Sequence, residues 1–165
     1  MAELRDLTVD DLAAAHVINQ ANVPDVGEVS PERLAWLQEM TSVSMGVFDD
    51  DGSMLGFCMV FPPGTDYDST NYRWFMERYD DAYYLDRVAF SEAARRRGLG
   101  TRLYAAVEQR IVDDAPAIAR LALEVNSIPP NEGSLAFHTG RGYRELERRP
   151  TPYGIEVAMF EKPLR

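Results

Sequence analysis

The sequence has little cysteine and histidine and no long apolar segment. Its one cysteine, Cys58, lies in an apolar run and can form no internal disulfide, and the two histidines, His16 and His138, are too few for a structural zinc site. The longest apolar runs, residues 55–61 and 83–90, are far shorter than the roughly 20 residues that a membrane span requires. We therefore expect no disulfide framework, no metal site and no membrane-spanning helix.

Basic residues are also scarce relative to acidic ones. The chain has 17 Lys and Arg against 27 Asp and Glu, a net charge of −10. Such a charge repels nucleic acid and anionic membranes and attracts a cationic acceptor such as an amine. The first residues, Met1 to Asp6, become acidic at once and lack the basic-then-apolar pattern of a signal peptide. These features predict a cytoplasmic protein that binds neither nucleic acid nor membrane.

A length of 165 residues with 45% apolar content predicts one domain over residues 1–165. Capping residues, apolar spacing and turn residues indicate an order of elements along it. The predicted strands are residues 2–7, 43–48, 54–61, 83–90, 119–125 and 154–160, and the predicted helices begin near Thr8, at Ser30, at Leu99 and at Asn131. The strands at 43–48 and 54–61 form a hairpin, and residues 83–125 form a βαβ unit with parallel strands. The fold class is therefore α/β, a mixed sheet with helices on both faces.

About twenty residues between Phe61 and Tyr83 show no clear element, which is long for a connection in a compact domain. The stretch therefore either has a function or contains a helix or strand that the sequence pattern does not show. Its many aromatic residues are consistent with two roles. They cover the sheet or form a dimer contact, or they form a lid and a wall for an acceptor pocket.

The segment from Arg95 to Thr101 contains the only three consecutive cationic residues of the chain. It follows a strand and enters a helix, and it reads Arg95, Arg96, Arg97, Gly98, Leu99, Gly100 and Thr101. Helix starts carry unpaired backbone N–H groups and partial positive charge, and glycine lets an anion approach them closely. Arginine adds charge-assisted bonds to phosphate oxygens. The segment predicts a phosphate site, although a solvated surface turn would show the same composition.

Two other nucleotide-binding patterns do not fit this segment. The third glycine of the G-x-G-x-x-G pattern is absent, and no Gly-Lys-Ser or Gly-Lys-Thr is present.

Arg95-x-x-Gly98-x-Gly100 after a strand resembles the R/Q-x-x-G-x-G/A signature of the GCN5-related N-acetyltransferases, the GNAT superfamily. Downstream, residues 123–126 (Leu-Glu-Val-Asn), 131–138 (Asn-Glu-Gly-Ser-Leu-Ala-Phe-His) and Gly142-Tyr143 resemble the second motif of that family. The order of elements is also similar, so the likeness covers nearly the whole chain and implies a single GNAT domain with a six- to seven-stranded sheet. Residues 69–75, together with residues 84–87 and 129–131, further resemble an uncharacterised bacterial subgroup.

The resemblance implies acetyl-CoA as the donor. The backbone of Val88 and Phe90 would pair with its pantetheine arm, and Asn131 would hydrogen-bond the arm, cap its own helix, or do both. The backbone N–H groups from Arg96 to Thr101, which include those of Arg97, Gly98, Leu99 and Gly100, would hold the pyrophosphate, with the Arg95 and Arg96 side chains nearest the phosphates. Because family members often pair, a homodimer is also implied.

Acyl transfer to an amine needs a base, because an ammonium has no lone pair. The resemblance places Glu124 in that role, and Asp86 is the second candidate because strand alternation puts it on the same side as Val88 and Phe90. Either acid would alternatively be a structural carboxylate. The departing thiolate also needs a proton, and the family usually has a tyrosine for this where the chain has His138.

The histidine leaves that acid role open. In one case His138 donates the proton as a cation or binds the sulfur as a neutral donor. In a second case Tyr143, Tyr83 or Tyr84 replaces it, and in a third His138 has only a packing role. Two functions follow: transfer of acetyl to a primary amine of a small molecule or a peptide terminus, or a non-catalytic acyl-CoA-binding or regulatory domain.

Overall fold

A computed structural model describes all residues from Met1 to Arg165 and shows one seven-stranded sheet. Its strand order is β1-β2-β3-β4-β5-β7-β6, and every neighbouring pair is antiparallel except β4 and β5. The strands are β1 (Glu3–Asp6), β2 (Val43–Phe48), β3 (Met54–Phe61), β4 (Ala82–Phe90), β5 (Arg120–Ile128), β6 (Arg144–Pro150) and β7 (Glu156–Pro163). The predicted α/β class, hairpin and parallel βαβ unit are confirmed.

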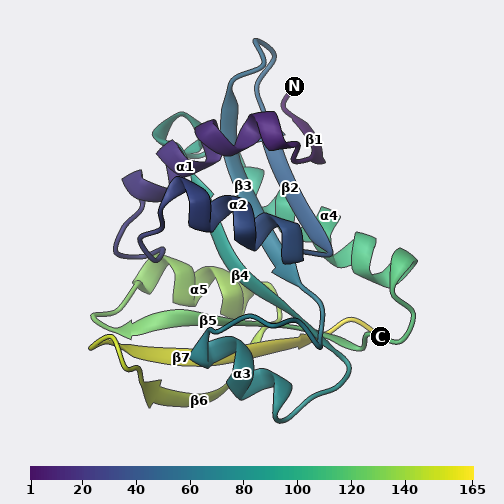
Figure 1. The fold of residues 1–165 in the computed structure, drawn as a ribbon, viewed down its shortest axis with the longest axis vertical. Coiled ribbons are helices and arrows are strands. Elements are labelled where there is room, and N and C mark those ends of the chain that lie inside the picture. The colour runs from purple at the N-terminus through teal and green to yellow at the C-terminus, as the bar shows by residue number, and fades with distance from the viewer.

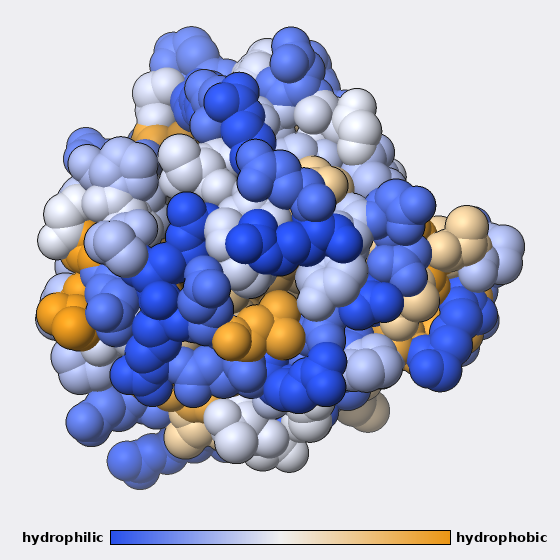
Figure 2. All heavy atoms as spheres, turned by 90° about the horizontal axis from the view of Figure 1, so that it is seen from below, coloured by the Kyte–Doolittle hydropathy of each residue, from blue (hydrophilic) through white to orange (hydrophobic).

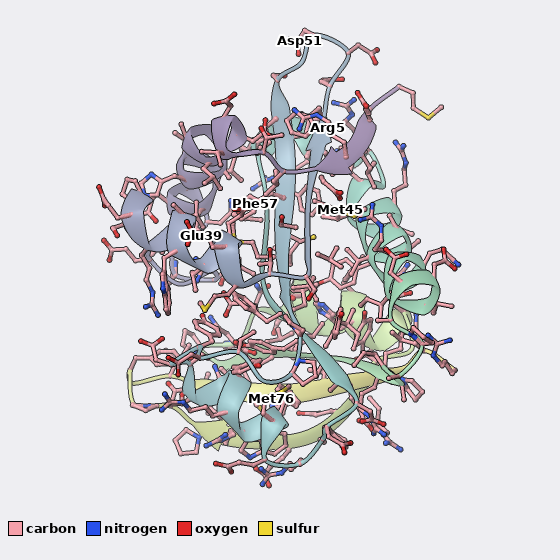
Figure 3. All side chains as sticks on the ribbon, turned by 45° about the vertical axis from the view of Figure 1, so that its right-hand side comes forward. Arg5, Glu39, Met45, Asp51, Phe57 and Met76 are labelled. Carbon is pink, nitrogen blue, oxygen red and sulfur yellow. The ribbon has the colours of Figure 1, made fainter.

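Helices cover both faces of the sheet. They are α1 (Leu12–Ala21), α2 (Pro31–Met40), α3 (Thr70–Met76), α4 (Leu99–Asp114) and α5 (Glu132–Gly140), with short 3-10 turns η1 (Val9–Asp11) and η2 (Glu92–Ala94). Side chains of α1, α2 and α3 share one apolar core, and those of α4 and α5 belong to the other (Figure 1). Met45 and Phe57, on neighbouring strands, point into these two cores from opposite faces (Figure 3). No helix is long and apolar enough to cross a bilayer.

At the starts of α2 and α3, a serine side chain accepts a hydrogen bond from one of the free N–H groups. Ser30 accepts a hydrogen bond from the Arg33 N–H at 3.0 Å, and Pro31 occupies the first turn of α2, where its missing N–H costs nothing. Ser69 caps α3 in the same way through the Tyr72 N–H at 3.2 Å.

Two elements escape the sequence prediction. Helix α3 lies in the stretch for which the sequence shows no clear element, and its buried aromatic side chains pack against the sheet, which is one of the two roles predicted for them. Strand β6 is absent from the predicted order because its residues are mostly charged and exposed. It is an edge strand, and the surface seen from below, toward this end of the sheet, is largely hydrophilic with small separate apolar patches (Figures 1 and 2).

The parallel strands β4 and β5 separate soon after they begin. Only residues 82–84 of β4 pair with residues 120–122 of β5. Beyond this point β5 pairs with β7 alone. β4 also carries a bulge, because Leu85 and Arg87 oppose consecutive residues of β3 and Asp86 opposes none. The separation opens the middle of the sheet, and the bulge changes which face the side chains of β4 reach.

Candidate active site

A cleft of about 820 Å³ lies where β4 and β5 diverge. Its walls are residues 85–90 of β4 and 123–126 of β5, and the loop of residues 22–28 after α1 and residues 67–71 before and at the start of α3 border it. Side chains of α4 and α5 and the turn between β6 and β7 complete the lining. The cleft is large enough for an extended ligand arm and an acceptor together.

The edge of β4 that faces this cleft has free backbone groups. The Ser91 N–H bonds to the Leu55 oxygen of β3 at 2.8 Å, so alternation directs the backbone groups of Val88 and Phe90 away from β3 and into the cleft. The Phe90 carbonyl already accepts a hydrogen bond from Asn22 Nδ2 at 3.0 Å. Val88 therefore offers both its N–H and C=O to an extended ligand, whereas Phe90 offers mainly its N–H.

The start of α4 is a row of unpaired amides. No backbone N–H group from Arg96 to Thr101 donates a hydrogen bond within the protein, and the first that does is that of Arg102, to the Gly98 oxygen at 3.2 Å. Gly98 has φ of +67°, a conformation that glycine adopts without strain. A Cβ at Gly100 would lie 3.7 Å from the Phe137 ring and 3.9 Å from the Phe90 ring, so this row adjoins the end of the cleft.

The three arginines of this segment have different partners. Arg97 forms an ion pair with Asp49 at 2.9 Å, and its hydrogen bonds hold the pKa of that carboxyl at about 2. Arg95 contacts Glu92 at 3.4 Å on the exposed surface, and Arg96 has no ion-pair partner. The Arg97 side chain is thus committed to the β2–β3 turn, and Arg96 is the arginine most available to an anion.

Glu124 lies on the cleft wall and is held by two donors. Tyr84 donates to its Oε2 at 2.6 Å and Asn71 donates to its Oε1 at 3.1 Å. Burial, reinforced by the charge of Asp86, raises the pKa of Glu124 to about 8, although both hydrogen bonds oppose this rise. A carboxyl with this pKa exchanges its proton near neutral pH, which is the range in which a general base works best.

Asp86 also lines the cleft, but it does not face the same side of the sheet as Val88 and Phe90, contrary to the prediction. The bulge places Asp86 and Arg87 on the same face, where Asp86 accepts hydrogen bonds from Tyr67 at 2.7 Å and from Arg87 at 2.8 Å. Val88 and Phe90 pack against the core on the opposite face. With its side chain 6% exposed and paired with a cation, Asp86 fits a structural carboxylate better than a base.

His138 is a buried neutral residue that is fixed at both ring nitrogens. Its Nδ1 lies 2.7 Å from the Ser134 carbonyl oxygen, which can only accept, so Nδ1 carries the proton. Its Nε2 therefore accepts from the Tyr104 hydroxyl at 2.8 Å. Burial lowers the pKa of His138, which disfavours the cation. Both His138 and Tyr104 line the cleft, together with Asn131, whose side chain caps α5 through the Ser134 N–H.

The tyrosines named as alternatives to His138 have other positions. Tyr143 donates to Glu108 at 2.9 Å, and Tyr84 donates to Glu124. Tyr83 is half-buried and packs against the core of α4, and neither Tyr83 nor Tyr143 lines the cleft. Tyr104 was missed because nothing in the local sequence brings α4 and α5 together at this point.

Asn71 was missed for the same reason as helix α3. Its two amide hydrogens bridge Glu124 and the Tyr153 hydroxyl, the latter at 2.9 Å, so it links three separate parts of the chain. Its place in an apparent loop gave no signal for this contact.

The fold and the site define an α/β protein with an anion cradle at a helix start, an open strand edge beside it, and a titratable carboxyl in the same cleft. The model of the Acetyltransferase (GNAT) family matches residues 10–143, and the chain belongs to this family. The resemblance drawn from the two sequence motifs is thereby confirmed.

Solved structures show the same fold at low sequence identity. The ribosomal-protein-S18-alanine N-acetyltransferase of Escherichia coli is 21% identical with a TM-score of 0.77, over 99% of this chain and 94% of that one. Ard1 from Thermoplasma volcanium is 15% identical with a TM-score of 0.79, over 98% and 97%. The Salmonella typhimurium yncA protein, solved with its cofactor acetyl-CoA, is 17% identical with a TM-score of 0.73, over 100% and 95%. No curated protein sequence matches the chain significantly.

Proposed function

We propose that the protein transfers an acetyl group from acetyl-CoA to a primary amine. The observation that carries this proposal is the row of unpaired amides from Arg96 to Thr101, next to a cleft that Glu124 lines. Unpaired N–H groups at a helix start suit a diphosphate, and the open edge of β4 suits an extended amide-bearing arm. Both features fit coenzyme A, and the family membership supports the same donor.

The same geometry supports an assignment of the residues that would hold this donor. Amides from Arg96 to Thr101, which include those of Gly98, Leu99 and Gly100, would bind the diphosphate, with the Arg96 guanidinium beside it. The Val88 N–H and C=O would pair with the arm as a neighbouring strand does. When bound, acetyl-CoA supplies an acyl carbon activated by its thioester.

Glu124 would act as the general base. As a carboxylate it accepts a proton from the acceptor ammonium, either directly or through one water, and so frees the nitrogen lone pair for attack on the acyl carbon. The C–N bond forms and the C–S bond breaks, and the second proton that the nitrogen loses neutralises the departing thiolate. We assign His138 a positioning role, because its unprotonated Nε2 accepts a hydrogen bond from the Tyr104 hydroxyl and so holds that hydroxyl in the cleft wall.

The alternative of a non-catalytic acyl-CoA-binding domain is less well supported. A domain that only bound the donor would have no need of a buried carboxyl whose pKa lies at about 8.

A thiol-release assay with acetyl-CoA and a panel of primary amines tests the proposal. We expect free coenzyme A to appear only when a suitable amine is present. Binding of the donor without turnover on any amine, in a panel that includes peptides with free N-termini, would contradict acetyl transfer and favour the binding domain.

A further inference from the structure

The cationic side chains that line the cleft are both neutralised by aspartates. They are Arg33 and Arg87, and no lysine is among the lining residues. Arg33 pairs with Asp68 near the surface, and Arg87 pairs with Asp86 and also donates to Asn19 Oδ1 at 3.0 Å. An acidic group on the acceptor would therefore find no free cation in the cleft.

Acidic side chains without a cationic partner line the same cleft. Asp25 and Glu28, in the loop after α1, are exposed and make no ion pair. Glu124 is held only by neutral donors, and with a pKa of about 8 it adds to the negative charge only when it gives up its proton. The lining of the cleft thus has an excess of negative charge that no side chain of the protein offsets.

A buried acceptor oxygen is available beside Glu124. Asn71 is 4% exposed, and both its amide hydrogens are used, by Glu124 and by Tyr153. This arrangement fixes the orientation of the amide, so its Oδ1 is left without a protein donor. Asn71 lines the cleft, and its Oδ1 is not one of the fully buried polar atoms that lack a hydrogen-bond partner. This oxygen is therefore accessible to a ligand. An ammonium beside Glu124 can donate one hydrogen to this oxygen and another to the carboxylate.

On the basis of the proposed function, we propose that the acceptor is an amine with no anionic group near the reacting nitrogen and with a second positive charge elsewhere in the molecule. Asn71 and Glu124 receive the reacting ammonium, and Asp25 and Glu28 attract the second charge. Free α-amino acids are excluded, because their carboxylate would lie among unpaired carboxylates without a cation to offset it. Two kinds of molecule have both positive charges: a free diamine, and a peptide whose N-terminus is followed by a lysine or arginine.

Three amines of nearly equal size test the charge preference. They are 1,4-diaminobutane, 4-amino-1-butanol and 4-aminobutanoate, whose far ends are positive, neutral and negative. An exposed charge pair at 4 Å is worth about 1 kcal/mol in water, which is about fivefold in rate. We expect kcat/KM to fall by about fivefold or more from the diamine to the alcohol, and again from the alcohol to the acid.

The double variant Asp25→Asn/Glu28→Gln tests where the preference originates. It should bring the ratio of diamine to alcohol toward one, whereas Asp10→Asn/Glu39→Gln, which removes two exposed acids outside the cleft, should leave that ratio as it is. An unchanged ratio in the cleft variant would overturn the assignment to these residues.

A second set of substrates, three dipeptide amides, distinguishes a free diamine from a peptide N-terminus. Ala-Lys, Ala-Gln and Ala-Glu amides should show the same order of rates. The set of substrates with the larger kcat/KM identifies which of the two kinds of molecule is the acceptor. Turnover with equal rates or the reverse order overturns this inference and leaves acetyl transfer intact. Release of no thiol with any of the six compounds would instead overturn the proposed function, and the inference with it.

Discussion

Replacing Glu124 by glutamine, a neutral residue of the same shape, has an effect on stability that depends on pH. The folded protein raises the pKa of this carboxyl from 4.5 to about 8. Between these values the unfolded chain is ionised and the folded protein keeps the proton, so the free energy of unfolding falls as pH rises from about 4.5 to 8. Glu124→Gln removes this loss.

The magnitude follows from the size of the pKa rise. At about 1.4 kcal/mol per pH unit, the nominal cost above pH 8 is roughly 5 kcal/mol. Because Glu124 borders an open cleft, water screens its charge and we expect about 2 kcal/mol. For a chain of this size that is roughly 4–8 °C in Tm.

Thermal unfolding of both proteins at pH 5 and pH 8.5 measures the effect. We expect Glu124→Gln to exceed the wild type at pH 8.5, with a much smaller or reversed difference at pH 5. Acetyl transfer should also rise with pH through about 8 in the wild type and fall by about 10²–10⁴-fold in the variant. A Tm difference that is the same at both pH values would refute the reasoning about burial, and unchanged turnover would remove Glu124 from the role of base.

The remaining predictions concern the arginines and the histidine. Arg96→Ala should weaken coenzyme A binding by several-fold in calorimetry, whereas Arg97→Ala, whose side chain already pairs with Asp49, should weaken it less; the opposite order would contradict the assignment. His138→Ala should lower the free energy of unfolding by about 2–4 kcal/mol in urea titrations, because it leaves a cavity and an unpaired Tyr104 hydroxyl. His138→Tyr should also lower the free energy of unfolding, by about 1–3 kcal/mol, because a larger ring does not fit among the surrounding aromatic side chains. Equal stability of the wild type and both variants would show that His138 and Tyr104 are not tightly packed.

Local patterns in the sequence were sufficient for the βαβ unit and for the start of α4. Strand residues, glycines and helical spacing each act over a few neighbouring residues, so the parallel pair and the unpaired amides near Gly98 could be predicted. Helix α3 is only seven residues long, and β6 lies at an edge where charged residues are tolerated, so neither produces a clear periodicity.

The site itself depends on contacts between distant elements. The bulge that turns Asp86 to the other face has no sequence signal, and the pairing of Tyr104 with His138 needs α4 and α5 to be in place first. The cytoplasmic location and a homodimer stay predictions of the sequence.

Calorimetric titration of coenzyme A into the wild type and Gly100→Glu tests the amide cradle most directly. A Cβ at Gly100 makes only ordinary contacts, so the variant should fold, but its carboxylate would lie beside amides that are proposed to bind a diphosphate. Gly140→Glu, at an open position at the end of α5, carries the same added charge as a control. We predict binding by the wild type and the control, and at least a tenfold loss in Gly100→Glu with its Tm close to that of the wild type. Equal binding by all three proteins, or none by the wild type, would contradict the account.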